Sequence, residues 1–285
     1  MRTITDIREM QNIALQLKRE GKSIGFVPTM GYLHEGHLSL LSKARIENDV
    51  TVVSIFVNPL QFGPKEDLAT YPRDFQRDSS LAEKEGNDYI FFPSAEEMYP
   101  VIPSVTVKVQ DRTDVLCGKS RPGHFDGVAT VLIKLFNIVQ PDKVYFGLKD
   151  AQQVAVVDGL VRDFNIPVEI VPVQTAREQD GLAKSSRNVH LLPSERDQAS
   201  ALHHSLKMAE SLIAEGENDP QKILYRMRGY IEQNTSGKID YIEILSYPDL
   251  KQLTLLEGQI IIAMAVKFSK ARLIDNAIIS LKKES

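Results

Sequence analysis

Short apolar runs alternate with amphipathic segments through the first half of the chain. Residues 23–29 (SIGFVPT) and 51–57 (TVVSIFV) are apolar runs of strand length, and they predict buried strands. Residues 37–47 place Leu and Ala at helical spacing, so a helix is expected between these strands. The alternation continues with helices expected at 74–85, 128–139 and 152–164 and strands at 88–92, 143–146 and 168–173. This pattern predicts a parallel sheet covered by helices on both faces.

The pattern changes after about residue 175. A polar stretch, residues 176–188, precedes helices expected near 194–214 and 220–233 and strands expected at 239–245, 259–266 and 271–279. Helices followed by strands, without alternation, predict a smaller α+β domain. A chain of 285 residues is long enough for two domains, which we expect at residues 1–175 and 176–285.

Composition excludes several classes of protein. Lys and Arg number 34 against 38 Asp and Glu, and a net charge of −4 draws the chain to neither nucleic acid nor anionic lipid. The single cysteine, Cys117, excludes an intrachain disulfide and favours a reducing compartment. Residues 1–6 lack the apolar core of a signal peptide, and the longest apolar run, residues 260–266, is too short to cross a bilayer. We therefore expect a cytoplasmic protein with no nucleic-acid or membrane partner.

The most informative segment is residues 28–38 (PTMGYLHEGHL), where a strand ends and a helix opens. The free N–H groups and positive dipole at a helix start favour phosphate. His34 and His37 are three residues apart, so both can face one polyphosphate, where imidazolium donors would stabilise developing charge. A zinc site of the HExxH type needs histidines four apart, and two solvated histidines in a turn are the plain alternative.

Two further loops are candidate binding sites. Residues 58–64 (NPLQFGP) suit either a small-molecule pocket, with Gln61 as donor and acceptor, or a plain surface turn. Residues 118–120 (GKS) resemble the end of a Walker phosphate loop, but Thr113 replaces the required glycine, so a Walker site is rejected. The adjoining residues 121–125 (RPGHF) are either a stiff cationic loop for an anion or a solvated loop.

The last two motifs carry lysines. Residues 146–153 (FGLKDAQQ) join a strand to a helix, where Lys149 can neutralise phosphate and Asp150 either binds ribose hydroxyls or caps the helix. Residues 184–188 (KSSRN) either close over a triphosphate or form an ordinary polar loop. The chain is acidic overall, yet its motifs gather cationic side chains, which predicts a local site for a polyanion.

In this order, the motifs resemble the pantothenate synthetase (pantoate–β-alanine ligase) family. The resemblance covers nearly the whole chain and runs through PTMGYLHEGH, FVNPLQFGP, YPRD, RPGHFDGV, FGLKDAQQ, DGLAKSSRN and KFSKARLIDN. Residues 34–37 (HEGH) are similar to the HxGH signature of the wider nucleotidylyl-transferase and class I synthetase group. Residues 184–187 (KSSR) take the place of a mobile KMSKS-like segment, with Lys184 where many relatives carry Met.

The resemblance implies a Rossmann-type domain over residues 1–175, a smaller C-terminal lid domain associated with dimer formation, and a homodimer. It implies that ATP and (R)-pantoate give pantoyl adenylate and pyrophosphate, and that the amine of β-alanine then displaces AMP to give pantothenate. Mg²⁺ would accompany ATP. After residues 71–73 (YPR), carboxylates that serve magnesium in some relatives are replaced, with Arg77 beside Asp78, so no metal ligand is assigned.

The resemblance also implies roles for individual residues. Nucleotide-binding residues are expected at Met30, Gly31, Tyr32, Leu33, His34, Glu35, Gly36, His37, Gly147, Leu148, Lys149, Asp150, Ala176, Lys184, Ser185, Ser186 and Arg187. Catalytic roles are expected for His34, His37 and Lys149, with His37 as the proton donor. Pantoate is expected to contact Gln61 and Gln153, with Asn58 nearby and Arg121 and His124 at the edge of the cleft.

Two other functions are open at this point. A nucleotidylyltransferase acting on a phosphate ester shares the type of fold, but it needs cations where this chain has Gln61 and Gln153. A nucleotide-binding regulator without catalysis would bind ATP and release no pyrophosphate with any acid.

Overall fold

The structure, a computed structural model, describes residues 1–64, 66 and 68–281, and the chain forms two compact units. Unit 1 comprises residues 1–110, 121–148 and 156–174, and unit 2 comprises residues 111–120, 149–155 and 175–285. The main division thus falls where the sequence pattern changes, and two short earlier segments pack with the C-terminal part. Helix α7 (Ala151–Asp163) crosses the division, because its residues 151–155 belong to unit 2.

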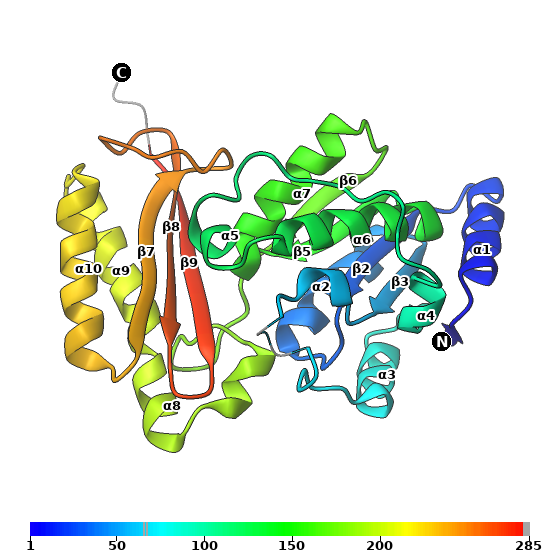
Figure 1. Ribbon diagram of the computed structural model, residues 1–285, viewed down its shortest axis with the longest axis horizontal. Helices are drawn as coiled ribbons and strands as arrows, with labels where there is room; N and C mark the ends of the chain where they lie inside the picture. Colours follow the sequence, from blue (N-terminus) through cyan, green and yellow to red (C-terminus); the bar gives the residue numbers. More distant parts are fainter. Residues whose placement is uncertain (65, 67, 282–285) are drawn as a thin grey trace. The chain divides into compact units, whose positions relative to one another are not determined.

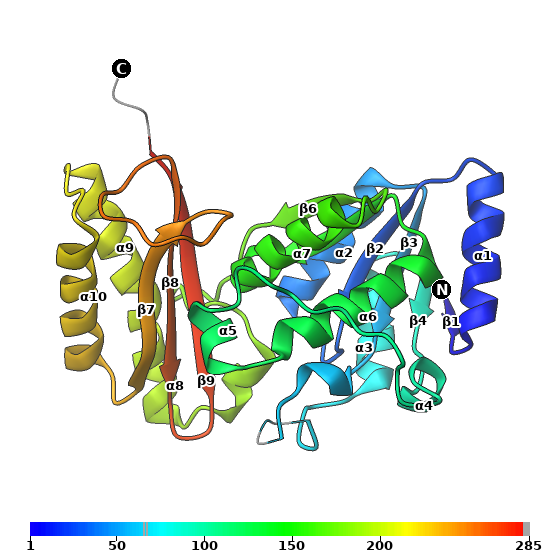
Figure 2. The same ribbon diagram turned by 45° about the horizontal axis from the view of Figure 1, so that its top comes forward.

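Unit 1 is built on a six-stranded parallel sheet flanked by helices (Figures 1 and 2). The strands follow one another in the order β1 (Arg2–Ile4), β4 (Tyr89–Phe91), β3 (Val50–Ile55), β2 (Ile24–Thr29), β5 (Lys143–Gly147) and β6 (Glu169–Val173). The helices of this unit are α1 (Ile7–Arg19), α2 (Glu35–Glu47), η1 (Pro59–Gln61), α3 (Phe75–Lys84), α4 (Ala95–Met98) and α6 (His124–Val139). The predicted α/β class with a parallel sheet is confirmed.

Both faces of this sheet are covered, which is why its strands read as continuous apolar runs. Helix α2 packs on β2, β3 and β5 and buries Leu40, Leu41 and Ala44 there. Right-handed crossovers place α2 and α3 on one face and α1, α6 and α7 on the other. The sequence interpretation did not identify β1, which has only three residues, or α1, although Asp6 caps α1 and its apolar residues recur at helical spacing.

Unit 2 contains an antiparallel sheet with the order β7 (Lys238–Ser246), β8 (Gln259–Lys267) and β9 (Arg272–Ser280). Its helical elements are α5 (Leu116–Ser120), η3 (Ser186–His190), α8 (Pro193–Ala199), α9 (Ala201–Ala214) and α10 (Pro220–Asn234), and η2 (Leu148–Asp150) lies at the division. The central strand β8 is buried from Ile260 to Val266 because α9 and α10 cover one face of the sheet and α5 covers the other. The smaller α+β unit expected from the sequence is confirmed.

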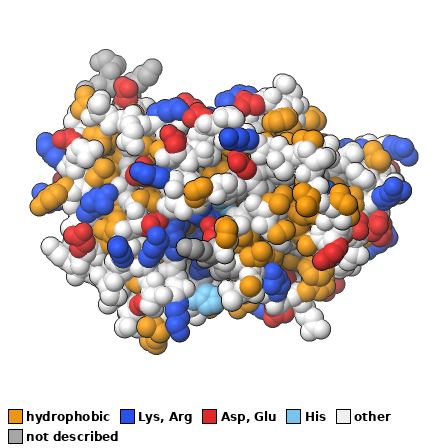
Figure 3. Space-filling view, in the orientation of Figure 1, with side chains coloured by type: hydrophobic (Ala, Val, Ile, Leu, Met, Phe, Trp, Pro, Cys, Tyr) orange, Lys and Arg blue, Asp and Glu red, His pale blue; other side chains and the backbone are white. Residues whose placement is uncertain are grey.

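Three of the sequence motifs follow strands of the parallel sheet. Strands β2, β3 and β5 end at Thr29, Ile55 and Gly147, and Thr29 pairs with Ile55 in the register. The carboxyl ends of parallel strands form one edge of a sheet, where ligands of open α/β sheets bind. Among the described residues, no helix combines the length and the hydropathy that a membrane span requires. Basic and acidic side chains are interspersed over the visible face of each unit (Figure 3).

Candidate active site

The segment between β2 and α2 turns sharply before its two histidines. Gly31 and Tyr32 have left-handed backbone φ angles of +85° and +51°. Glycine adopts such an angle freely, whereas a tyrosine does so at a cost of roughly 1–2 kcal/mol. A Cβ added to Gly31 would lie 2.9 Å from Ile55 Cγ2, so the close approach to β3 also requires glycine. Glycine at position 31 therefore permits the turn, and other contacts must stabilise the left-handed conformation of Tyr32.

His34 and His37 form a reciprocal cap at the start of α2. His34 Nδ1 accepts a hydrogen bond from the N–H of Gly36 at 3.1 Å, and His37 Nδ1 accepts one from the N–H of His34 at 3.2 Å. The ring centroids are 4.1 Å apart. This is a capping box in which histidines replace the usual Ser or Thr and Glu or Gln.

The cap determines how the two rings carry their hydrogens. Because both Nδ1 atoms accept from the backbone, each neutral ring has its hydrogen on Nε2. A second proton would have to occupy Nδ1 and would break the cap. The imidazolium donors expected from the sequence would give up these bonds at Nδ1, whereas neutral rings keep them and can donate through Nε2–H.

Sequence reasoning assigned no role to Asp78 of α3, which holds this loop by accepting two of its backbone N–H groups. Its carboxylate accepts the N–H groups of Tyr32 and Leu33, each at 2.7 Å. Its side chain is only 1% exposed. Asp78 and Ala82 are the buried residues of an otherwise polar helix, and a carboxylate four residues before Ala82 is the signal that could have revealed it.

After strand β3, Asn58 fixes the orientation of the side-chain amide of Gln61. Asn58 Nδ2 donates to Gln61 Oε1 at 3.2 Å and to the carbonyl of Gly127 at 3.1 Å. Its Oδ1 accepts from the hydroxyl of Tyr99, whose pKa burial raises to about 12. Gln61 Nε2 donates to the sulfur of Met30 at 2.9 Å, a weak acceptor that a better one can replace. Asn58 thus acts on Gln61, with all its own polar atoms engaged inside the protein.

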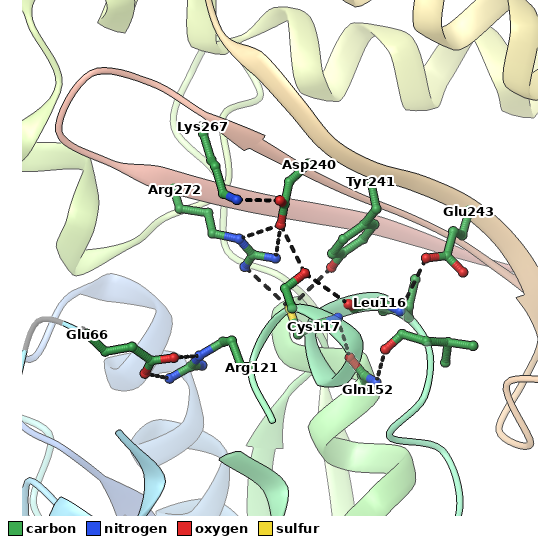
Figure 4. Close-up of polar contacts among 12 residues, drawn as sticks. Glu66, Leu116, Cys117, Arg121, Gln152, Asp240, Tyr241, Glu243, Lys267 and Arg272 are labelled. Atoms are coloured by element: carbon green, nitrogen blue, oxygen red, sulfur yellow. Dashed lines mark hydrogen bonds and ion pairs between the residues drawn. The ribbon is translucent and has the colours of Figure 1, made fainter. Parts of the chain in front are cut away.

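Arg121 and His124 also have protein partners. The Arg121 guanidinium binds both carboxylate oxygens of Glu66, at 2.8 and 2.6 Å (Figure 4). Burial by itself raises the pKa of Glu66, but hydrogen bonds and charge from Arg121 hold it below its usual value. His124 Nδ1 donates to the carbonyl of Gln61 at 2.8 Å, so its Nε2 accepts from Arg121 at 3.0 Å. The cationic loop expected from the sequence is therefore neutralised by Glu66 and braces η1.

In unit 2, the backbone at Lys149 is held by β9. Asn276 Nδ2 donates to the carbonyl of Lys149 at 2.9 Å. Lys149 Nζ lies 4.0 Å from the carboxylate of Asp150, and their side chains are 19% and 53% exposed. A Cβ added to Gly147 would meet nothing within 4 Å, so the end of β5 has open space beside its backbone.

The paired glutamines at the start of α7 have different environments. Gln152 is buried, and its Nε2 donates to the carbonyls of Arg112 and Val115, each at 2.9 Å. Its Oε1 accepts the N–H of Cys117 at 2.9 Å (Figure 4). Gln153 is half-buried. Gln152 is thus committed to unit 2, and Gln153 is the glutamine whose role in binding pantoate stays a prediction.

The polar stretch after residue 175 is partly buried and hydrogen-bonded. The N–H of Lys184 donates to the carbonyl of Ala176 at 2.9 Å, and a bridge joins Arg177 to Ala183. Lys184 Nζ pairs with Glu178 at 2.7 Å. Ser185 caps the start of η3, where its hydroxyl accepts a hydrogen bond from the N–H of Arg187 at 3.3 Å. The stretch is a small hairpin followed by a helical turn.

A buried carboxylate anchors this hairpin. Asp275 of β9 binds two nitrogens of the Arg177 guanidinium, at 2.7 and 3.0 Å, and Arg177 also donates to the carbonyl of Gly181. The Asp275 side chain is 1% exposed and that of Arg177 is 23% exposed. Neither partner was singled out from the sequence, because 98 residues separate them.

Within the described part of the chain, no group of three or more His, Cys, Asp and Glu side chains is arranged to hold a metal ion. Mg²⁺ commonly keeps several waters and binds through one or two carboxylates plus substrate phosphates. The side chains present therefore fit a Mg²⁺ ion that binds together with a nucleotide better than one coordinated by protein side chains alone.

Comparison with known proteins extends over almost the whole chain. Residues 2–278 match the family model described as pantoate-beta-alanine ligase. A pantothenate synthetase of Geobacillus sp. strain WCH70 is 61% identical over 272 residues, covering 95% of this chain and 96% of the relative. A pantothenate synthetase of Bacillus cereus strain B4264 is 58% identical over 282 residues, covering 99% of this chain and all of the relative, 100%.

Solved structures agree with these sequences. The pantothenate synthetase of Thermus thermophilus has a TM-score of 0.92 and 44% identity, covering 97% of this chain and 99% of that one. A pantoate-beta-alanine ligase of Francisella tularensis, complexed with beta-gamma ATP and beta-alanine, has a TM-score of 0.79 and 34% identity, covering 98% of this chain and 97% of that one. The resemblance drawn from the motifs is confirmed, and the chain belongs to the pantoate-beta-alanine ligase family.

Proposed function

We propose that His34 and His37 drive the first step of the reaction of this ligase, the ATP-dependent condensation of (R)-pantoate with β-alanine. In that step a carboxylate oxygen of pantoate bonds to the α-phosphorus of ATP, and the bond from that phosphorus to pyrophosphate breaks. In the second step the amine nitrogen of β-alanine bonds to the acyl carbon, AMP leaves with the carboxylate oxygen, and the nitrogen loses a proton. The products are pantothenate, AMP and pyrophosphate.

The observation that carries this proposal is the reciprocal cap of the two histidines at the start of α2. The cap sets both Nε2–H groups as donors, and the helix start adds a positive dipole end. Donors fixed in advance at developing negative charge stabilise a transition state without reorganising. In this proposal His37 donates to the departing pyrophosphate and His34 binds the same polyphosphate.

Pantoate is proposed to bind through Gln61 and Gln153, whose amides suit its hydroxyl and carboxylate groups. The support for Gln61 is the orientation of its amide, which Asn58 fixes. In this orientation Gln61 Nε2 donates to the sulfur of Met30, a weak acceptor that pantoate can replace. Arg121 and His124 are proposed to act by holding the backbone of Gln61. Asn58, Arg121 and His124 then shape the site for pantoate through Gln61.

The remaining candidates are proposed to bind ATP, and this rests on the family motifs. Lys149 is proposed to neutralise phosphate, Asp150 to bind ribose hydroxyls, and the backbone at Ala176 to meet adenine. The other nucleotide-binding candidates are Met30, Gly31, Tyr32, Leu33, Glu35, Gly36, Gly147, Leu148, Lys184, Ser185, Ser186 and Arg187. The side chain of Lys184 already pairs with Glu178, so ATP has to compete with that carboxylate.

Mg²⁺ is proposed to enter with ATP, bound mainly by phosphate oxygens and water. When bound, it would neutralise charge on the phosphates. A homodimer, a cytoplasmic location and a lid role for the C-terminal unit are part of the same proposal, and they rest on the family resemblance.

Exchange of labelled pyrophosphate into ATP tests the first step. We expect exchange that depends on pantoate and does not need β-alanine, because the adenylate forms before the amine reacts. Other carboxylic acids serve as controls for the acid, and a phosphate ester serves as control for a nucleotidylyltransferase. Exchange with the ester alone would contradict the ligase, and ATP binding without exchange would indicate a non-catalytic regulator.

Isotope labelling tests the order of the chemistry. Pantoate labelled with ¹⁸O in its carboxylate should yield AMP that carries one ¹⁸O, with unlabelled pyrophosphate. An acyl-phosphate mechanism would instead place the label in inorganic phosphate and release ADP. Mass spectrometry of quenched products distinguishes the two results. Without β-alanine, the labelled adenylate should accumulate on the protein, because a shielded site protects a mixed anhydride from water.

A further inference from the structure

Among the residues that the structure describes, no cation lies at hydrogen-bond distance from the buried carboxylate of Asp78. Its Oδ2 accepts the N–H of Tyr32 and its Oδ1 accepts the N–H of Leu33, both at 2.7 Å. The nearest cation, Arg77 on the same helix, is 3.6 Å from Oδ1 and is 43% exposed, so it offsets the charge only in part. A buried charge is costly to keep, and a neutral side chain would fill the same volume. The position of an ionised group here calls for a reason other than packing.

The two N–H groups belong to the turn that leads into the histidines. Tyr32 is held at a φ of +51°, one residue after Gly31 and two before His34. Left-handed tyrosine is unfavourable, so the turn persists only if its surroundings hold it. The guanidinium of Arg77 lies over the ring of Tyr32, 5.0 Å from the centroid, and is a second contact between α3 and this turn. Helix α3 therefore fixes the path by which β2 delivers His34 to the start of α2.

The geometry argues against Asp78 as a metal ligand. Both oxygens are engaged by backbone N–H groups, and the charge-assisted bonds are short. In addition, the described residues provide no cluster of three potential ligands around it. A carboxylate that accepts adjacent N–H groups of one loop instead fixes the position and direction of that loop.

We propose that Asp78 is a positioning residue of the ligase, which holds the turn at Tyr32 and Leu33 so that the His34–His37 cap meets the polyphosphate in the reactive geometry. The inference rests on the proposed roles of the two histidines. A displacement of about 1 Å in such a group costs ~10²-fold in rate, so we expect a loss of that order when the anchor is removed.

The ionisation of Asp78 provides a readout that a packing role would not give. Burial raises its pKa above the ordinary value, although the N–H groups of Leu33 and Tyr32 and the charge of Arg77 oppose the shift. The other charged groups facing it are Asp74 on α3, which raises the pKa further, and Arg73, which lines the same cavity of about 230 Å³. No charged side chain of β2 or β3 lines that cavity among the described residues, since Ile55 and Phe56 come from that side.

The raised pKa of Asp78 has different consequences for stability and for activity. Because the folded pKa lies above the unfolded one, ionised Asp78 opposes folding as the pH rises through this range, while the loop anchor needs the ionised form. Activity should therefore fall as the pH falls through the raised pKa, and stability should not fall with it on account of this group. A purely structural carboxylate would lose stability and activity together.

The test compares Asp78→Asn with Asp74→Asn in the full chain. Asp74 caps the same helix by accepting the N–H of Arg77 at 3.1 Å, a bond that stays within α3 and does not reach the loop. We expect Asp78→Asn to lower the single-turnover rate of adenylate formation by ~10²-fold, with a smaller change in KM for ATP, and to move the acidic limb of the pH profile to lower pH, because protonation of Asp78 no longer contributes to it. Asp74→Asn should keep the wild-type rate and retain an acidic limb, moved to lower pH because a like charge beside Asp78 is removed. Wild-type rates for Asp78→Asn would overturn the proposal.

Two further measurements separate the explanations. Restoration of the Asp78→Asn rate by excess Mg²⁺ would assign Asp78 to the metal and overturn the positioning role. If the variant fails to fold, Asp78→Glu decides: it keeps a carboxylate on α3 but displaces it by one methylene, so its adenylation rate should fall while circular dichroism stays native. Parallel loss of fold and rate would overturn the proposal. Wild-type protein without pantoate-dependent exchange would instead contradict the proposed function itself.

Discussion

Two buried carboxylates hold the candidate segments of the two units, and they do so by different chemistry. In unit 1, Asp78 accepts two backbone N–H groups of the loop before the histidines. In unit 2, Asp275 accepts hydrogen bonds from two of the three guanidinium nitrogens of Arg177, at the base of the hairpin that leads to residues 184–187. Both carboxylate side chains are 1% exposed.

The difference lies in what remains when the carboxylate is lost. Backbone N–H groups are neutral, so a loop that loses Asp78 can shift and find water, and the main loss is of geometry. The guanidinium of Arg177 is charged and mostly buried, so loss of Asp275 leaves a charge without its partner. Activity should therefore report on the first anchor, and stability on the second.

The largest effect is expected from the group that the first anchor positions. His37→Ala should slow adenylate formation by roughly 10²–10³-fold, about 3–4 kcal/mol, because one donor to developing charge is lost. His37→Gln supplies the side-chain acceptor usual at this position of a capping box and has no imidazole Nε2–H, so it should be equally slow but more stable than the Ala variant.

Rapid-quench single turnovers and thermal melts measure both quantities, with exposed His204→Ala as the control. Adenylate formation near the wild-type rate in either variant would remove His37 from the mechanism. Equal melting temperatures for the Ala and Gln variants would show that the reciprocal cap contributes little to stability.

The second anchor should show its effect in the free energy of unfolding. Asp275→Asn should lower it by about 3 kcal/mol, the low end for a broken buried pair, because Arg177 keeps 23% of its side chain exposed. Denaturant titration measures the change. The matched control is Asp180→Asn, which breaks the exposed pair with Arg196 in the same unit and should cost less than about 1 kcal/mol. Equal losses in the two variants would remove the distinction between them.

Substitutions of the glutamines proposed to bind pantoate should have smaller effects than loss of either anchor. Gln61→Ala and Gln153→Ala should each weaken pantoate binding by about 1–3 kcal/mol, because substrate polar groups lose their partners. ATP affinity should change much less. Calorimetric titration separates the two ligands, with exposed Gln16→Ala as a control. An equal loss of ATP affinity would mean that these amides do not bind pantoate specifically.

The smallest effect is expected at Lys184, whose charge is already paired. Lys184→Met removes the contact with Glu178, in which the two side chains are 16% and 31% exposed, so stability should change by less than about 1 kcal/mol. If Lys184 exchanges Glu178 for phosphate, ATP affinity should fall a few-fold at low salt and less at high salt. A loss of ATP affinity that does not depend on salt would argue for a packing role.

Much of the fold was predictable from local pattern. The continuous apolar runs predicted β2, β3 and β5 because strands buried on both faces need apolar side chains throughout. The strand β8 was predicted for the same reason. The Val- and Ile-containing run at 168–173 predicted the edge strand β6, of which only Val171 is buried. The edge strand β1 was not predicted, since its three residues are too few to form a pattern. Helix α1 was overlooked, although its apolar residues recur at helical spacing after the cap residue Asp6.

The candidate site divides in the same way. The loop with His34 and His37 was predictable because the end of a strand, a glycine and a helix start are consecutive in the sequence. The Nε2–H state of the rings was not, because it depends on which backbone groups Nδ1 meets. Likewise, the sequence placed a cation at Arg121 but did not show that Glu66 neutralises it.

The sequence by itself determined the alternation of strands and helices, the position of the motifs at strand ends and the family. These properties depend on residues that are close in the chain or on the order of motifs along it. Only the tertiary structure decided that Asp78 would hold Tyr32, 46 residues away, and that Asp275 would hold Arg177, 98 residues away. Such partners share no local spacing, because they meet only after hydrophobic burial has brought α3 to the loop and β9 to the hairpin.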